Sequence, residues 1–591
     1  MNDSKIDSSR WHFRLPYRSL IERALEHFSF AEKVIFYILA AAMLISASIL
    51  LFRVNDFLLV EVPAPGGSLS EGIIGSPRFI NPLLAISDAD RDLTALVYSG
   101  LLRARPDGTL IPDLAESYTV SEDGLTYDFI LKNNTTFHDG TPVTTEDVEF
   151  TVLKAQDPNL KSPKRANWDS VQVERVNGQE IRFILKQPYA PFLENTTMGI
   201  LPKHIWKNVT NEEFPLSFFN FEPVGSGPFI IGAISRNSSG IPGRYTFSPF
   251  NEYALGRPYL DTLFISFYPN EQLLLSAFSD GDIESVNSVT PSAVGTLKLD
   301  NSNLVTIPLS RIFGVFFNQN QAAIFADPKV RQALDRSLDK GKIVSLVLSG
   351  FGVPIDGPLP PGFLAKITKD DEVSGIDKVS AAQAILEGGG WVKNENGTYQ
   401  KTDKKKKTTQ TLSFSISTSN APELKHAAEL VRDTWQSMGA LVELKVFEPG
   451  DLSQNIIRPR KYDAILFGEI IGRDLDLFAF WHSSQRNDPG LNIALYTNTK
   501  ADKLLSDART ISDRETRLSK YREFEMELSK ETPAVFLYSP SFVYILPKKI
   551  QGVDLGHITV PSDRFENISE WYENTEKIWK IFINNSARAQ R

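Results

Sequence analysis

The sequence predicts an α/β protein that follows a single membrane-spanning helix near the N-terminus. A chain of 591 residues is too long for one hydrophobic core and suits several domain-sized units. An uncharged apolar run, VIFYILAAAMLISASILLF, occupies residues 34–52. Beyond it, strand-like and helix-like patterns alternate along the chain, which is typical of α/β units around a largely parallel sheet.

The apolar run is long enough to cross a hydrocarbon layer of about 30 Å. Basic residues gather before it, because Arg14, Arg18, Arg23 and Lys33 precede the run and only Arg53 follows closely. The positive-inside rule therefore places residues 1–33 in the cytoplasm and the chain after the run outside. A cleaved signal peptide is the alternative, but the long leader and the long run favour an uncleaved anchor. Residues 53–67, rich in Pro and Gly, form a linker to the body.

Local patterns predict individual elements of the body. Alternating apolar residues over 125–131 predict a half-buried strand. Thr144, with acidic residues directly after it, predicts a helix N-terminus, and so does Asp327 before a proline. A helix that contains Trp435 is expected to end at Gly439. The four lysines 404–407 predict a solvated hairpin tip.

Composition and motifs exclude several classes of function. The formal charge of −9 argues against a nucleic-acid partner, because phosphate binding needs clustered Lys and Arg. With no Cys there can be no disulfide, no Cys-ligated zinc and no lipid-attachment Cys. The seven His residues lack metal-ligand spacing, so no metal site is predicted. Nucleophile-elbow, zinc-helix and phosphate-loop motifs are all absent, so we expect neither an enzyme nor a bound cofactor.

A series of segments carries a family resemblance. They read NPLLA at 81–85, VYSGLL at 97–102, DGTLIPDLAESY through FHDGTPVTTEDVEF at 107–150, LPKHIW at 201–206, VGSGPF at 224–229, DPKVRQALD at 327–335, AILEGGGW at 384–391, and the stretch 462–482 that begins YD. In order and spacing these segments resemble family 5 of the bacterial extracellular solute-binding proteins, over roughly residues 68–575.

The resemblance implies a two-lobed periplasmic-binding-protein fold with an extra domain. The ligand would lie buried between two lobes that close on it by a hinge motion. Carried over by segment, the expected parts are a first lobe at 68–97, 223–318 and 540–575, an extra domain at 98–222, a second lobe at 319–539 and a C-terminal tail at 576–591.

The resemblance also implies a peptide ligand, held mainly through its backbone. An acidic residue in the stretch 468–476 would meet the ligand's amino group. The match offers Asp474 or Asp476 and does not choose between them; the alternative is that either one caps the next helix. Glu469 stands where the family usually has Trp and is a third candidate. The remaining predicted ligand contacts are Arg473, Trp481 and Tyr98.

The function expected from this resemblance is capture of peptides outside the cytoplasm and delivery to the permease subunits of an ABC importer. We expect a monomer that is held at the membrane by its N-terminal helix. Two alternatives stay open. The same fold could bind a metal chelate, haem or a sugar, or the protein could be a membrane-tethered peptide receptor or chaperone that feeds no transporter.

Overall fold

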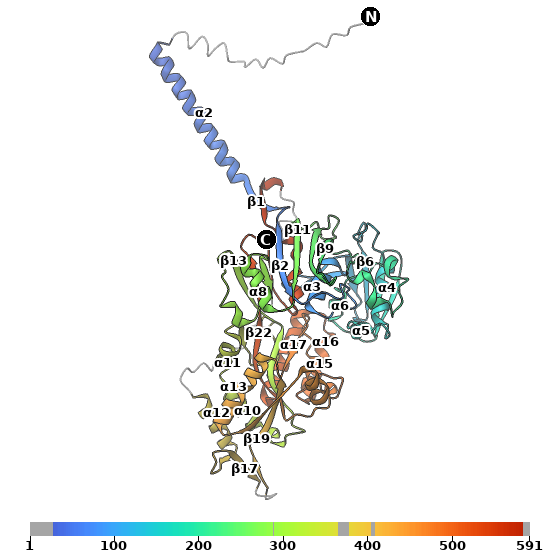
Figure 1. Cartoon of the computed structure of the whole chain (residues 1–591), viewed down its shortest axis with the longest axis vertical. Coiled ribbons are helices and arrows are strands. Elements are labelled where there is room, and N and C mark those ends of the chain that lie inside the picture. Colours follow the sequence, from blue (N-terminus) through green and yellow to red (C-terminus); the bar gives the residue numbers. More distant parts are fainter. Residues whose placement is uncertain (1–27, 288, 364–376, 404–407, 583–591) are drawn as a thin grey trace. The chain divides into compact units, whose positions relative to one another are not determined.

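The computed structural model describes residues 28–287, 289–363, 377–403 and 408–582 (Figure 1). The chain forms two compact units. Residues 1–64 and 575–591 make the smaller unit, and residues 65–574 make the larger unit.

The smaller unit is built on one long helix, α2 (Phe30–Leu58). The helix begins at Ser29, whose backbone N–H and hydroxyl both donate to the Glu32 carboxylate at 2.8 Å. The predicted run 34–52 lies inside this helix, none of its residues is buried, and it is long and apolar enough to cross a membrane. The helix continues directly into β1 (Leu59–Ala64), which pairs with β23 (Asn574–Trp579). A short helix, η8 (Lys580–Phe582), follows β23.

The larger unit contains a sheet that has twelve strands within the described residues. Its order is β20-β19-β21-β14-β22-β12-β2-β11-β10-β9, and β13 and β15 also pair with β22. The strands are β2 (Ser68–Ile74), β9 (Phe229–Arg236), β10 (Pro242–Pro249), β11 (Thr262–Tyr268), β12 (Ser285–Asn287), β13 (Ser302–Pro308), β14 (Arg311–Phe317), β15 (Gly352–Pro354), β19 (Ser413–Ser419), β20 (Leu441–Phe447), β21 (Ala464–Ile470) and β22 (Ala534–Pro547).

The long strand β22 belongs to both halves of this sheet. Its residues 534–540 pair with β14 and β15, whereas residues 541–547 pair with β12 and β13. The chain crosses a second time between β13 and β14, where Leu309 N–H donates to Pro540 O at 2.8 Å. The sheet therefore consists of two lobes that are linked by two adjacent crossings.

The expectation of a largely parallel sheet is wrong. Parallel pairing is limited to β2 with β11 and β12 and to β19 with β20 and β21, and the other neighbours run antiparallel. The reason is topological, because β9 and β10 form a hairpin and β22 runs antiparallel to β13 and β14, so helices and strands that alternate along the chain do not become parallel neighbours in the sheet.

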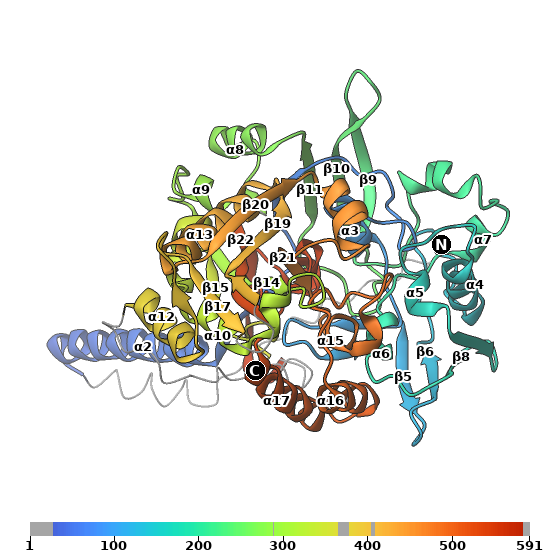
Figure 2. The same ribbon diagram turned by 90° about the horizontal axis from the view of Figure 1, so that it is seen from below.

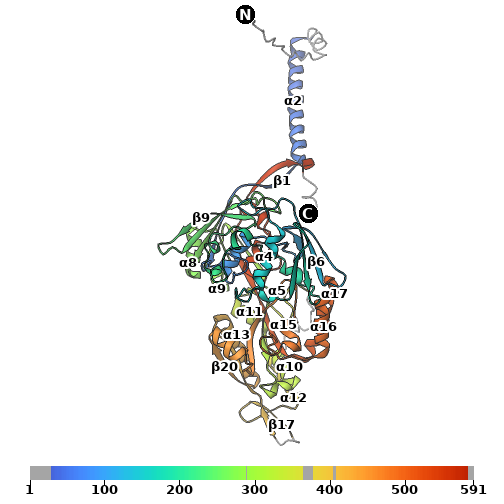
Figure 3. The ribbon, with the colours of Figure 1, turned by 90° about the vertical axis from the view of Figure 1, so that its right-hand side faces the viewer.

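Both faces of the sheet around β14 are covered by helices. Val315 and Phe317 pack with α10–α13 on one face, while Ile312 and Phe316 pack with α15–α17 on the other. Figures 2 and 3 show α13 and α17 on opposite sides of these strands. The helices on the two faces are α10 (Pro328–Arg336), α11 (Lys340–Leu348), α12 (Lys378–Gly388), α13 (Pro422–Met438), α15 (Phe478–Trp481), α16 (Thr499–Thr510) and α17 (Arg514–Glu531).

A second, smaller antiparallel sheet lies within the predicted extra domain, beside the β2–β9 part of the large sheet (Figure 1). Its order is β5 (Ala115–Val120), β6 (Thr126–Leu131), β8 (Glu180–Leu185), β7 (Val171–Arg175), and it is accompanied by the pair β3 (Leu102–Ala104) and β4 (Leu110–Pro112). Phe129 and Phe183 of this sheet share one buried core with Leu69 and Ile265 of the large sheet. The two sheets are thus joined by a continuous core. The helices near them are α3 (Asp88–Val97), α4 (Thr145–Gln156), α5 (Arg165–Trp168), α6 (Phe192–Asn195), α7 (Lys203–Trp206), α8 (Glu271–Asp280) and α9 (Pro291–Val294).

Most local predictions are confirmed. Helix α4 begins after Thr144, which donates to the Asp147 carboxylate from both its N–H and its hydroxyl. Asp327 caps α10 by accepting from Lys329 N–H. Helix α13 ends at Gly439, whose φ of +111° favours glycine. The predicted lysine tip at 404–407 lies outside the described residues, between the paired strands β17 (Tyr399–Asp403) and β18 (Thr408–Thr411).

Two of the quoted motifs meet in space. Gly227 N–H donates to Val97 O at 2.7 Å, so the VGSGPF segment lies against the VYSGLL segment. A Cβ on Gly225 would stand 2.1 Å from Val97 O, and one on Gly227 would stand 2.5 Å from Val97 C. Only glycine fits at these positions, and the close contact holds the backbone that leads into Tyr98.

Candidate ligand-binding cavity

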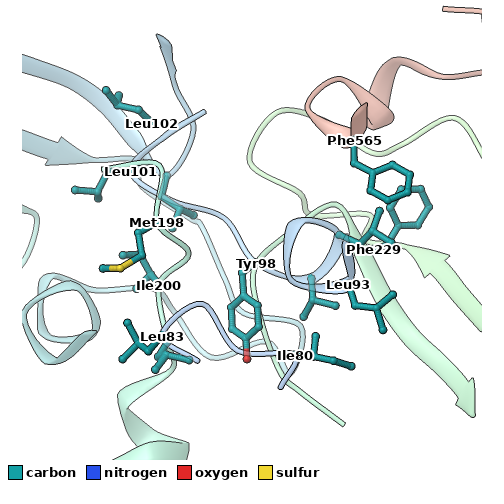
Figure 4. Packing of buried hydrophobic residues seen from close by; sticks show 14 of the residues in the cluster. Ile80, Leu83, Leu93, Tyr98, Leu101, Leu102, Met198, Ile200, Phe229 and Phe565 are labelled. Carbon is teal, nitrogen blue, oxygen red and sulfur yellow. The ribbon is translucent and has the colours of Figure 1, made fainter. Parts of the chain in front are cut away.

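Helix α3 carries the first of the predicted site residues. Ser87 and Asp90 cap its N-terminus reciprocally, and the helix ends at Tyr98. The Tyr98 ring lies among buried apolar side chains (Figure 4) and is 4% exposed. Among the residues that the structure describes, its hydroxyl has no hydrogen-bond partner, and burial raises the pKa of Tyr98.

Tyr98 lines a cavity of about 410 Å³ in the larger unit. Four stretches of chain form the walls, namely 82–98, 164–168, 194–199 and 559–563, and Gly472 and Arg473 complete them from the end of β21. A neighbouring cavity of about 150 Å³ shares part of this lining, including Tyr98, Arg473 and Asp563. The site therefore combines both lobes with the segment of the small sheet.

Arg473 holds these segments together. Its guanidinium lies 2.9 Å from the Glu194 carboxylate and 3.3 Å from Asp563, and it also contacts Glu566. The Arg473 side chain is 8% exposed. Because burial outweighs the attraction of Arg473, the pKa of Glu194 is raised and that of Glu566 is raised to about 8. One arginine thus faces three carboxyl groups at the cavity.

The wall also carries cations with few partners. Within the part of the chain that the structure describes, the Lys164 ammonium makes no hydrogen bond or ion pair, and Arg91 lies 3.5 Å from Asp88. Burial and the charge of Arg91 lower the pKa of Lys164. Arg311 lies outside the lining of both cavities but close enough to Asp88, Arg91 and Asp563 to be affected by their charges, and its Nε has no hydrogen-bond partner among the described residues.

Several buried polar atoms on the cavity lining likewise have no hydrogen-bond partner within the described part of the chain. They are the hydroxyls of Thr94, Tyr98 and Thr559 and the Nε of Arg473. Buried polar groups are normally hydrogen-bonded, so this wall suits a polar ligand that supplies the missing partners. With carboxylates and cations on the same wall, the cavity can hold a ligand that carries both signs of charge.

Asp474 and Asp476 lie elsewhere, each beside an arginine of the second lobe. Asp474 is 2.7 Å from Arg517, and Asp476 is 2.8 Å from Arg509. Asp476 also accepts from Phe478 N–H at 3.1 Å, which is the helix-capping role considered as the alternative. Burial raises the pKa of Asp474. Neither residue lines the two cavities described above.

Glu469 of β21 and Trp481 of α15 form a buried pair. Glu469 is 3% exposed and neither carboxylate oxygen has a hydrogen-bond partner, so burial raises its pKa well above the ordinary value. The nearby Trp481 side chain lowers the pKa of Glu469, but by less than burial raises it. Trp481 is fully buried and packs against Phe316 and Phe536.

Of the six predicted site residues, the structure brings only Tyr98 and Arg473 to the cavity wall. Sequence reasoning missed Arg91, Lys164, Glu194, Thr559 and Asp563. Arg91 lies in α3 and Asp563 lies in a short helix, and no sequence pattern distinguishes either of them from a charged surface residue. Among the described residues, no group of three or more His, Asp or Glu side chains is placed to hold a metal ion.

A two-lobed fold with a polar cavity, walled by both lobes, defines the class of extracytoplasmic solute-binding proteins. The model of "Bacterial extracellular solute-binding proteins, family 5 Middle" matches residues 109–490. The oligopeptide-binding protein AppA of Bacillus subtilis is 30% identical over 520 residues, which cover 86% of this chain and 92% of that protein. The chain belongs to family 5 of the bacterial extracellular solute-binding proteins.

Solved structures agree with this assignment. The structure of Bacillus subtilis AppA in complex with a nonapeptide matches with a TM-score of 0.65 and 29% identity, covering 87% of this chain and all of that one. NikZ from Campylobacter jejuni, in complex with Ni(L-His), matches with a TM-score of 0.65 and 26% identity over 85% of this chain and 99% of that one.

Proposed function

We propose that this protein captures peptides outside the cytoplasm and delivers them to the permease subunits of an ABC importer. The observation that carries the proposal is the cavity, whose wall presents carboxylates, cations and unpartnered hydroxyls on segments from both lobes. A peptide has an ammonium group, a carboxylate and many backbone donors and acceptors, so it can satisfy all three. The similarity to an oligopeptide-binding protein supports the same ligand class.

Within the cavity we propose Tyr98 and Arg473 as ligand contacts, as predicted from the sequence. Glu194 and Asp563 are the acidic residues on the wall of the larger cavity and are our first candidates for the ligand's amino group. The roles predicted for Asp474, Asp476, Glu469 and Trp481 stay predictions that the same binding experiments test.

We also propose boundaries for the lobes. Because β14 pairs with β21 and with the first half of β22, the first lobe would end near Leu309, earlier than the predicted residue 318. The other predicted limits, 68–97, 98–222 and 540–575, stand as proposals. The crossing of β22 at Ser539–Ser541 supports the last of them.

The membrane anchor is part of the proposal. Helix α2 has 29 residues and a length of about 44 Å at 1.5 Å per residue. It is therefore longer than the hydrocarbon layer of about 30 Å, and we propose that it stays uncleaved and keeps the body at the outer face of the membrane. N-terminal sequencing of membrane-extracted protein tests this, since a mature chain that starts between about 50 and 70 would contradict it.

Binding is tested on the full chain in mild detergent. Mass spectrometry of co-purifying ligands identifies the class directly, and a defined peptide library should raise the melting temperature. A ligand that binds only the native state adds RT ln(1 + [L]/Kd), about 2.7 kcal/mol at a hundredfold excess over Kd. Nickel–histidine, haem and sugars serve as the comparison ligands. If one of these stabilises the protein and no peptide does, the peptide assignment is wrong.

A further inference from the structure

The C-terminal segment of the chain returns to the end of the N-terminal helix. Strand β23 pairs with β1, which continues α2 without a break. Beyond this pairing, three side chains of the segment contact the last turn of α2. The Trp579 indole donates to Asn55 at 2.9 Å, Lys577 lies 4.0 Å from Asp56, and the Lys580 ammonium lies 4.8 Å from the Phe57 ring centre.

The same segment exposes large apolar side chains. Ile581 is 74% exposed and Phe582 is 70% exposed, and Phe57 on the helix beside them is 75% exposed. Trp579, at 43% exposed, uses its one polar atom on Asn55 and leaves much of its ring uncovered. Clustered exposure of this kind marks an interaction surface.

The position of this cluster along the helix identifies what it touches. The uncharged run of α2 ends at Phe52, and Asn55 lies three residues, or about 4.5 Å, beyond it. That depth is the headgroup region of a bilayer whose hydrocarbon layer ends near Phe52. Trp at this level, with Lys side chains around it, is the composition of membrane interfaces.

We propose that Trp579, Ile581 and Phe582, with Lys577, Lys580 and Phe57, form a lipid-contacting platform that sits in the outer headgroup layer. The lysines match anionic phosphate groups, and the apolar side chains enter the layer beneath them. The platform is continuous with the membrane anchor, on which the inference rests. Its consequence is that both chain ends of the larger unit, Pro65 and Asn574, lead into segments fixed at the bilayer surface.

The absence of cysteine from the natural sequence makes a site-specific test possible. Single cysteines introduced at Ile581→Cys, Phe582→Cys, Leu50→Cys and Leu216→Cys are labelled with a polarity-sensitive fluorophore. The full-length protein is then placed in vesicles of phosphatidylglycerol and phosphatidylcholine, with and without brominated acyl chains. Leu50 reports on the anchor, and Leu216, which is 82% exposed in the larger unit, is the matched control for an exposed apolar site.

We expect blue-shifted emission and bromolipid quenching at Ile581 and Phe582, deeper quenching at Leu50 and neither effect at Leu216. Lys577→Glu together with Lys580→Glu should reduce the blue shift at Ile581 in anionic vesicles and leave Leu50 unchanged. If Leu50 is quenched but Ile581 and Phe582 behave like Leu216, the platform is refuted while the anchor stands. If Leu50 itself is unquenched, the anchor is wrong and the platform is refuted with it.

Discussion

Two arginine-centred clusters adjoin at the neighbouring residues Asp563 and Arg564 but differ in how completely their charges are paired. Arg564 lies 2.7 Å from both Glu71 and Asp92, and all three side chains are completely buried. Glu71 also accepts from Tyr544 and Asn287, so both of its oxygens have hydrogen-bond partners. Arg473, by contrast, faces three carboxyl groups on the wall of a cavity, and its Nε has no partner.

The two clusters meet in one short helix, η6 (Pro561–Phe565). Asp563 contacts Arg473 at the cavity, whereas its neighbour Arg564 is directed into the core. A saturated network in the core stabilises the fold, since its members would otherwise be buried unpaired charges. A network beside a cavity whose donors and acceptors are only partly hydrogen-bonded can offer the remaining polar atoms to a ligand. The two clusters therefore differ less in charge or burial than in how far their hydrogen bonds are satisfied.

The largest expected effect is on folding. Arg564→Met removes the partner of two buried carboxylates and should lower the free energy of unfolding by about 3–5 kcal/mol. Arg473→Met is the matched control and should cost clearly less, because cavity water can reach the carboxyl groups it leaves. Urea denaturation measures both. Equal losses would remove the distinction between the two clusters.

The second effect is on ligand affinity. Glu194→Gln keeps the shape of the side chain and removes its charge, so a peptide ammonium held there should lose about 2 kcal/mol or more of binding free energy. Asp474→Asn and Asp476→Asn test the candidates chosen from sequence. Titration calorimetry with a free peptide and its N-acetylated form measures the charge contribution, because the acetylated form should bind wild type weakly and respond little to the correct substitution.

Should Asp474→Asn or Asp476→Asn alone weaken binding of the free peptide, the sequence-based candidate is right and the cavity acid is wrong. Wild-type affinity in all three variants would mean that none of these residues holds the amino group.

The third effect is a difference in pH dependence. Burial raises the pKa of Asp92 to about 6 and that of Glu566 to about 8, above their ordinary values of 3.8 and 4.5. The folded protein therefore keeps protons that the unfolded chain releases. The resulting stability is present at low pH and is lost as pH rises through about 6 for Asp92 and through about 8 for Glu566.

Glu566→Gln should therefore flatten the fall in unfolding free energy between pH 4.5 and about 8, whereas Asp92→Asn should change only the part between pH 3.8 and about 6, so the fall between about 6 and 8 belongs to Glu566 alone. Thermal denaturation across a pH series separates the two windows. A fall above neutral pH that survives Glu566→Gln would show that another group releases the proton.

The smallest expected effect belongs to Lys164. It has no ion pair within the described residues, so Lys164→Met should change the free energy of unfolding by about 0.5 kcal/mol or less. Peptide affinity should fall by about 1 kcal/mol or less, and the salt dependence of the association rate should become weaker. Stopped-flow binding at two ionic strengths checks this, with Lys503→Met, a surface lysine paired to Asp507, as control.

Much of this molecule follows from local sequence. The apolar run predicts α2, the acid after Thr144 predicts the start of α4, and Gly439 predicts the end of α13, because capping and apolar periodicity act over a few residues. The motif VGSGPF predicts the family. Why the motif contains glycine at 225 and 227 is visible only in the structure, where a Cβ at either position would collide with the Val97 backbone.

Pairing between distant side chains could not be predicted in this way. Asp474 and Asp476 match the family's acidic stretch, yet their arginines come from α16 and α17, more than thirty residues further along the chain. Glu194 and Asp563 resemble surface acids in sequence, and only the fold brings them to the cavity, where both contact Arg473. Strand direction likewise cannot be predicted locally, because alternating helices and strands do not reveal that β22 runs antiparallel to β13 and β14.

The long apolar helix α2, the helix caps and the family follow from the sequence, since each depends on neighbours along the chain or on ordered motifs. The tertiary structure alone decided which carboxylate meets which arginine, and therefore which charges are saturated in the core and which remain at the cavity. The physical reason is that a charged side chain costs little in water and much in a protein interior, so its role depends on the partners and the solvent that the fold places around it.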